Sequence, residues 1–191
     1  MKNKNNIIGV VGAGTMGNGI AHVFALNNYD VILVDLNDSI LNDALKTINS
    51  NMLRQVKKEA ILQTDMNDAL DRITISNEIS DLQDADIVIE AIKEDLNIKG
   101  NLFKQLDLIC KSDTILASNT SSISINKLAD FTNRKDKVIG MHFMNPVPIM
   151  KLIELIKGAK TSDITINYII EISKDINKIP VECNDSPGFV S

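Results

Sequence analysis

A glycine turn near the amino terminus constrains this chain more than any other stretch. Residues 7–11 form a short apolar run that breaks into the pattern Gly-x-Gly-x-x-Gly at Gly12, Gly14 and Gly17, and residues 18–26 then predict a helix. Strand, glycine turn and helix in this order are typical of a dinucleotide-binding unit. The first glycine permits the tight turn, the second lets the backbone approach a pyrophosphate, and the third lets the helix pack on the strand. The N–H groups at the helix start then face the phosphates.

The motif alone does not establish nucleotide binding, since glycine-rich turns also arise for packing. A second strand is predicted at 29–35, and it ends in Asp35. A carboxylate at this distance from the glycines accepts hydrogen bonds from the ribose hydroxyls. Its charge would repel a 2′-phosphate and no arginine follows in 36–39, so the sequence favours NAD over NADP. The alternative is that Asp35 starts a turn or caps the helix predicted near Ser39.

Composition narrows the class of protein. The 191 residues are 44% hydrophobic and 24% charged, which is ordinary for a globular chain with a buried core. The net charge of −5, with both signs mixed along the chain, gives no indication of a nucleic-acid partner. Cys110 and Cys183 lack metal-ligand spacing, so we expect reduced, structural thiols and no metal. The run after Lys2 and Lys4 is too short for a signal peptide or membrane span, which favours a cytoplasmic protein.

Three further apolar runs predict strands of a parallel sheet: residues 85–91, 114–118 and 138–143. Polar side chains follow or end each run. Glu90 and Glu94 lie near the end of the first, the run 119–122 (Asn-Thr-Ser-Ser) follows the second, and His142 ends the third. Ligands of open α/β sheets bind at the carboxyl ends of the strands, so these residues are candidates for a site. For 119–122 the alternative is a plain loop that caps the next helix.

An acid stands between apolar neighbours in the strand predicted at 151–156. Burial of Glu154 in such a strand would be energetically costly without a partner, and an imidazole is a suitable partner for a carboxylate. His142 precedes this strand, whereas His22 lies inside the first predicted helix beside Val23 and is interpreted as a packing or surface residue.

The remaining segments continue an α/β pattern, with strands expected at 73–76 and 179–182 and helices at 38–60 and 162–174. A short helix is expected at 64–70, with Asp65 available as its N-cap. A further helix follows the strand at 85–91, and its predicted buried stripe is Leu96, Ile98, Leu102, Phe103, Leu106 and Ile109.

Four stretches together resemble a known family: VGAGTMGNGIAHVFA, SNTSSISI, GMHFMNPVPIMKLIELI and NDSPGFVS. They closely resemble the L-3-hydroxyacyl-CoA dehydrogenases, particularly the bacterial 3-hydroxybutyryl-CoA dehydrogenases of fatty-acid or butyrate metabolism. The resemblance implies that residues 1–191 form one NAD-binding Rossmann-like domain, a doubly wound, mostly parallel sheet with extra C-terminal strands. It also implies NAD as cofactor, an acyl-CoA substrate and no nucleic-acid or membrane partner.

The same resemblance implies roles for single residues. His142 takes the proton of the substrate's 3-hydroxyl as hydride leaves C3, Glu154 orients the imidazole, and Ser121 touches the substrate and the nicotinamide region. Asn51 and Lys58 are implied contacts of the coenzyme A moiety. With the glycine turn and the ribose acid, the implied cofactor contacts are Gly12, Ala13, Gly14, Thr15, Met16, Gly17, Asp35, Glu94, Lys99, Asn119, Ser121 and Asn145.

The family pattern continues past Ser191 with a substrate-binding asparagine and a helical domain that completes the cleft and forms a homodimer. From this resemblance we expect the 191-residue chain to bind NAD, to turn over acyl-CoA poorly, and to expose an apolar patch toward that domain. Two other readings remain open: a related hydroxyacid or sugar-acid dehydrogenase that does not use coenzyme A, and a non-catalytic NAD-binding relative.

Overall fold

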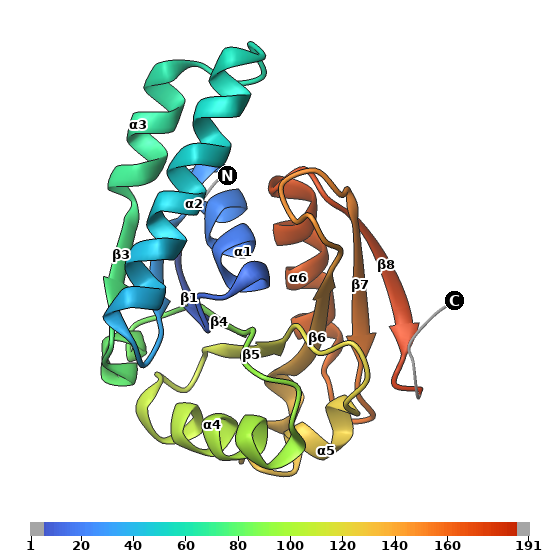
Figure 1. The fold of residues 1–191 in the computed structure, drawn as a ribbon. Helices are drawn as coiled ribbons and strands as arrows, with labels where there is room; N and C mark the ends of the chain where they lie inside the picture. Colours follow the sequence, from blue (N-terminus) through green and yellow to red (C-terminus); the bar gives the residue numbers. More distant parts are fainter. Residues whose placement is uncertain (1–5, 187–191) are drawn as a thin grey trace.

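The computed structural model describes residues 6–186, which form one sheet covered by helices (Figure 1). The strands are β1 (Ile7–Val11), β2 (Asp30–Val34), β3 (Ile73–Ser76), β4 (Ile87–Glu90), β5 (Ile115–Ser118), β6 (Val138–Phe143), β7 (Leu152–Lys157) and β8 (Ile179–Asn184). The α-helices are α1 (Thr15–Leu26), α2 (Asp38–Lys57), α3 (Gln63–Asp71), α4 (Leu96–Ile109), α5 (Ile125–Ala129) and α6 (Asp163–Asp175). Two short 3₁₀ turns are η1 (Ile79–Leu82) and η2 (Lys135–Lys137).

The strand order is β3-β2-β1-β4-β5-β6-β7-β8. Neighbours from β3 through β6 are parallel, β7 runs antiparallel to β6, and β8 is parallel to β7. This confirms the predicted doubly wound, mostly parallel sheet with extra C-terminal strands. The order reverses between β1 and β4, and a crevice forms at such a switch point beyond the strands' carboxyl ends.

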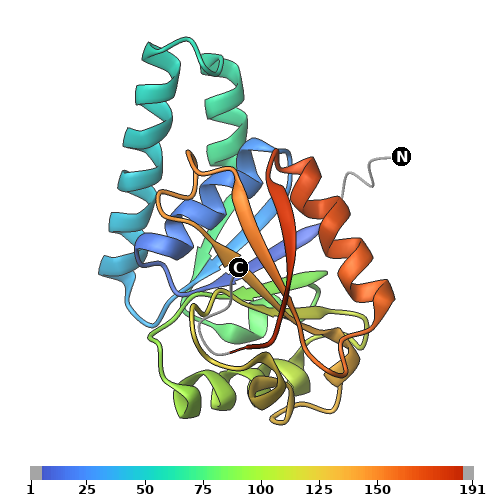
Figure 2. The ribbon, with the colours of Figure 1, turned by 90° about the vertical axis from the view of Figure 1, so that its right-hand side faces the viewer.

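Helices cover both faces of the sheet, which explains why the central strands are almost wholly apolar. On one face α1 and α6 bury Ile20, Phe24, Ile166 and Ile169. On the other, α4 and α5 bury Phe103 and other apolar side chains. The antiparallel helices α2 and α3 extend beyond the sheet as a hairpin (Figures 1 and 2).

Two local predictions were wrong. Asp65 is not the N-cap of α3. The helix begins at Gln63, so Asp65 already lies within its first turn. Leu62 is the N-cap, and the backbone N–H of Leu62 donates a hydrogen bond to the Asp65 carboxylate at 3.0 Å. Ile98 is 45% exposed, so it does not belong to the buried stripe predicted for α4. The buried face instead starts at Lys99, which the apolar pattern could not include.

The structure also bears on the expectations about cysteines, membrane spans and metal ions. Cys110 is buried, Cys183 is half-buried, and both are free. Within residues 6–186 no helix combines the length and apolar character that a membrane crossing needs. The same residues contain no cluster of three or more His, Cys, Asp or Glu side chains suited to a metal ion. Lys2, Lys4 and the end of the NDSPGFVS stretch lie outside the described residues.

Candidate cofactor and catalytic site

The glycine turn leaves open space where a phosphate would approach. Gly12 has φ of +99°, and a Cβ there would lie 2.7 Å from the carbonyl oxygen of Ala91. A Cβ on Gly17 would lie 1.6 Å from the carbonyl oxygen of Gly12. A Cβ on Gly14, in contrast, would meet no described atom within 4 Å. Gly14 is also the N-cap of α1 and offers no side-chain cap, so the first-turn N–H groups are suited to an anionic ligand.

Asp35 lies against this turn rather than at a helix start. Its Oδ2 accepts a hydrogen bond from the backbone N–H of Ala13 at 2.8 Å. The cap of α2 is Asn37, whose side chain accepts from the backbone N–H of Ser39, so the capping alternative for Asp35 was wrong. The carboxylate therefore stands beside the phosphate turn, as a ribose-binding acid requires. The residues of the turn and the acid thus fit a dinucleotide.

His142 and Glu154 form a direct pair. They lie opposite each other in the antiparallel ladder of β6 and β7, and His142 Nδ1 is 2.7 Å from Glu154 Oε2. Glu154 is 8% exposed, while the imidazole is half-buried. The prediction that Glu154 needs an imidazole partner is confirmed. The carboxylate fixes the orientation of the ring, which suits it for proton transfer.

A cavity of about 290 Å³ gathers many of the predicted residues at the carboxyl edge of the parallel strands. Those that border it are Met16, Glu94, Lys99, Asn119, Ser121, His142 and Asn145, with Ala91, Ile92, Phe143 and Met144. The Asn119 Oδ1 accepts from the backbone N–H of Phe143 at 2.8 Å, which ties the end of β5 to the end of β6. Four sequence segments therefore meet at one site, because parallel strands end at the same edge of the sheet.

A buried ionic cluster lies behind this cavity. Glu90 and Lys99 side chains are 0% and 1% exposed, and Lys99 Nζ lies 2.5 Å from Glu90 Oε1 and 3.1 Å from Glu94 Oε2. Burial raises the pKa of Glu90 despite the opposing charge of Lys99. Burial works in the same direction on Glu94, but hydrogen bonds from Thr120 and Lys99 and the Lys99 charge hold the pKa of Glu94 below its usual value. The sequence indicated Glu90 only by its place at a strand end.

The two residues predicted for coenzyme A are not part of this cavity. Asn51 is half-buried on α2, and Lys58 is exposed just after the last residue of that helix. Neither is among the described residues that border the cavity. Their role therefore remains a prediction.

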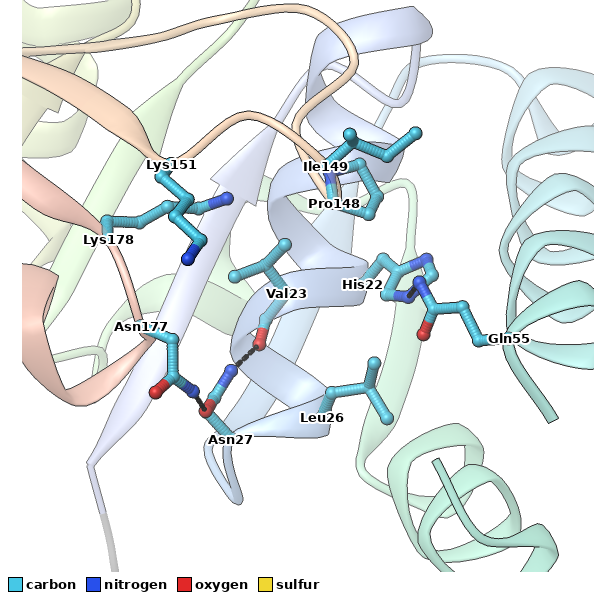
Figure 3. A pocket seen from close by; sticks show the side chains of 10 residues that line it. All are labelled: His22, Val23, Leu26, Asn27, Gln55, Pro148, Ile149, Lys151, Asn177 and Lys178. Carbon is cyan, nitrogen blue, oxygen red and sulfur yellow. Dashed lines mark hydrogen bonds between the residues drawn. The ribbon is translucent and has the colours of Figure 1, made fainter. Parts of the chain in front are cut away.

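A second cavity, of about 210 Å³, lies toward the far end of α1 from the glycine turn (Figure 3). His22 borders it and is completely buried, so it is a packing residue rather than a surface one. Its Nε2 is 3.4 Å from Gln55 Nε2, and its Nδ1 has no hydrogen-bond partner in the described part of the chain. Lys178 Nζ donates to the carbonyl oxygens of Val147 and Met150, at 2.5 and 2.6 Å, and so holds the connection between β6 and β7.

Doubly wound topology, an open phosphate turn and an acid at the end of β2 define a dinucleotide-binding domain. Comparison with known proteins gives the family. The family model described as "3-hydroxyacyl-CoA dehydrogenase, NAD binding domain" matches residues 7–186. The chain belongs to this family, whose members bind NAD through this domain.

Individual relatives agree with this assignment. A 3-hydroxybutyryl-CoA dehydrogenase of Clostridioides difficile is 46% identical over 183 residues, which are 96% of this chain and 65% of that protein. The mitochondrial hydroxyacyl-coenzyme A dehydrogenase of Homo sapiens is 41% identical over 187 residues, covering 95% of this chain and 60% of that protein. The crystal structure of (S)-3-hydroxybutyryl-CoA dehydrogenase PaaH1 from Ralstonia eutropha has a TM-score of 0.95 and 47% identity, covering 97% of this chain and 66% of that one. The chain thus spans about two thirds or less of the length of these relatives.

Proposed function

We propose that the protein oxidises L-3-hydroxyacyl-CoA with a short acyl chain, 3-hydroxybutyryl-CoA in particular, to 3-ketoacyl-CoA with NAD, and catalyses the reverse reaction. The observation that supports this most is the 2.7 Å contact between His142 Nδ1 and Glu154 Oε2 at the edge of a cavity that Ser121 also borders. A base with a fixed orientation would then lie at the same cavity as the Ser121 hydroxyl group, which we propose contacts the substrate oxygen. The names of the relatives point to the same chemistry.

The dyad supplies the proton transfer. With its Nδ1–H donated to Glu154, His142 has Nε2 as its basic nitrogen. Nε2 takes the proton of the 3-hydroxyl while the hydrogen on C3 leaves with its electron pair as hydride, and it returns the proton in the reverse direction. Glu154 stabilises the imidazolium that forms. When NAD is bound, it supplies the acceptor for the hydride.

The cofactor would lie along the carboxyl edge of the sheet. We propose that residues 12–17 hold its pyrophosphate and that Asp35 binds the adenosine ribose. Glu94, Lys99, Asn119, Ser121 and Asn145 border the cavity at the nicotinamide end, and of these Lys99 is almost completely buried. The open space at Gly14 and the position of Asp35 beside Ala13 support this arrangement.

For the substrate, Ser121 would contact the acyl end and Asn51 and Lys58 the coenzyme A moiety. The exposed ammonium of Lys58 is suited to a phosphate group of coenzyme A. From the family resemblance we also propose a cytoplasmic enzyme that acts as a homodimer. Light scattering of the full-length protein and cell fractionation check these two points.

Calorimetric titration with NADH and NADPH tests the cofactor, followed by addition of acetoacetyl-CoA to the NADH complex of the full-length protein while the nicotinamide absorbance is recorded. We expect binding of NADH in preference to NADPH, and oxidation of NADH only when acetoacetyl-CoA is added. Binding of NADH without oxidation by the full-length protein would contradict the proposed reaction, and absence of NADH binding would contradict the site.

A further inference from the structure

The buried pair of Glu90 and Lys99 is more than a link between β4 and α4. Glu90 is the last residue of β4, and Lys99 lies in the first turns of α4. Glu90 Oε1 accepts from Lys99 Nζ at 2.5 Å and from the backbone N–H of Ile92 at 2.7 Å, while its Oε2 accepts from Ser118 Oγ at 2.6 Å. Both carboxylate oxygens are therefore engaged, and they join the ends of β4 and β5.

The Lys99 ammonium is likewise fully hydrogen-bonded within the protein. Its ammonium contacts Glu90 Oε1, the carbonyl oxygen of Ile92 at 3.2 Å and Glu94 Oε2 at 3.1 Å. An ammonium has three N–H donors, so each has a partner within the protein. In this arrangement all three N–H groups of Lys99 are used within the protein, and one of them holds Glu94.

Glu94 passes this constraint on to the serine loop, residues 120–122. Its Oε2 faces Lys99, while its Oε1 accepts from the backbone N–H groups of Ser121 and Ser122 at 3.1 and 3.2 Å. The same Oε1 also accepts from the hydroxyl groups of Ser122 and Thr120. One carboxylate thus fixes the backbone of the residue proposed to contact the substrate and the nicotinamide region.

Stability alone does not account for such a pair. Apolar residues of similar volume often replace a buried ion pair with no loss of stability, whereas removal of one partner leaves a costly unpaired charge. A fully bonded polar network, in contrast, fixes one geometry. The contacts of Glu90, Lys99 and Glu94 all lead to the loop at the edge of the cavity.

We propose that Glu90 and Lys99 are positioning residues, which hold Glu94 so that it fixes the serine loop in the shape needed at the nicotinamide end of the cofactor. This inference rests on the proposed function in assigning that end of the cofactor to the cavity. We have assigned the ADP part of the cofactor to residues 12–17, in the turn after β1 and the first turn of α1, and to Asp35, directly after β2. Loss of the positioning should therefore affect the nicotinamide end selectively.

The variant Lys99→Met tests this, with binding of NADH and of ADP measured by calorimetry. We expect NADH affinity to fall about tenfold, as for the loss of a hydrogen bond to a charged group, while ADP affinity changes less than about twofold. Asp107→Asn is the control, because Asp107 also forms an ion pair that is mostly shielded from solvent, with Arg134 at 2.7 Å, and among the described residues its side chain bonds only to Asn133 and Arg134, outside the serine loop. It should leave both affinities unchanged. Unaltered NADH binding in folded Lys99→Met, or an equal loss of NADH and ADP binding, would overturn the proposal.

Hydrogen exchange provides a readout that needs no cofactor. In Lys99→Met the backbone amides of Ser121 and Ser122 should exchange about tenfold faster, while amides in β1 keep their rates. If that variant does not fold, Glu94→Gln at the cavity edge should give the same selective change. Unchanged exchange at both serines would overturn the positioning role. Failure of the wild-type protein to bind NADH would instead contradict the proposed function and leave the exchange result to decide the positioning.

Discussion

His142 and Glu154 face each other across the antiparallel strands β6 and β7, and the imidazole Nδ1 meets the carboxylate Oε2 at 2.7 Å. Because the two residues are directly paired in the ladder, the backbone sets the separation of their side chains. The sheet therefore orients the proposed base without the help of a flexible loop.

Replacement of His142 by glutamine separates chemistry from binding. Glutamine lacks a group that can take the hydroxyl proton, so kcat of the full-length protein with 3-hydroxybutyryl-CoA should fall by about 10²- to 10⁴-fold. NADH affinity, measured by calorimetry, should change less than about twofold, since the cofactor contacts proposed here lie elsewhere. A large loss of NADH affinity would show that His142 has been assigned the wrong role.

The glycines of the turn should differ in what their substitution damages. Gly14→Ala places its Cβ in open space, so the variant should fold normally but bind NADH at least about tenfold more weakly, because the methyl group occupies the approach of the pyrophosphate. Calorimetry and thermal unfolding of the same sample measure the two effects.

Gly17→Ala serves as the opposite case. Its Cβ would lie 1.6 Å from the Gly12 carbonyl oxygen, so α1 must move away from β1. We expect a loss of roughly 3 kcal/mol or more in the free energy of unfolding, measured with urea. Equal stability of the two variants would contradict the packing role of Gly17.

Asp35 should decide the choice between NADH and NADPH. In Asp35→Ala the charge that repels a 2′-phosphate is removed, together with the proposed bonds to the ribose and the observed bond from Ala13. The preference for NADH over NADPH, taken as the ratio of the two dissociation constants, should fall by roughly tenfold. A preference that survives the substitution would mean that other residues discriminate between the cofactors.

His22 should make stability depend on pH. Burial lowers the pKa of His22 from 6.5 to about 4; the hydrogen bond between His22 and Gln55 opposes this shift and the charge of Lys178 adds to it. The unfolded chain therefore binds a proton between these pH values that the folded chain does not, so stability rises with pH across this window and is lost as pH falls. Between pH 7 and pH 5 this costs about 2 kcal/mol.

The variant His22→Gln removes this titration and tests it. Urea unfolding at both pH values should show a smaller loss for the variant than for the wild-type protein, by about 2 kcal/mol. Carboxylates titrate in both proteins, so their contribution to the pH dependence of the free energy of unfolding cancels in this comparison. Equal losses would mean that His22 is protonated in the folded state.

Features that depend on neighbours along the chain could be predicted from the amino-acid sequence. The glycine turn, the apolar strands and the amphipathic helices follow from local backbone preferences and from side-chain periodicity, and the structure confirms them. The position of Glu154 among apolar residues also predicted a partner for it, since burial of an unpaired carboxylate is energetically costly. Four stretches of the sequence also resemble one family, and the comparison with known proteins confirms that the chain belongs to it.

How these segments meet in space could not be predicted from local patterns. The antiparallel direction of β7 against β6, which brings Glu154 opposite His142, depends on long-range pairing that no local pattern encodes. The buried face of α4 begins at Lys99 because its ammonium finds Glu90, nine residues earlier, so an apolar stripe that included Ile98 was wrong. Burial of a charge depends on a partner's position in space, and that position exists only once the sheet has formed.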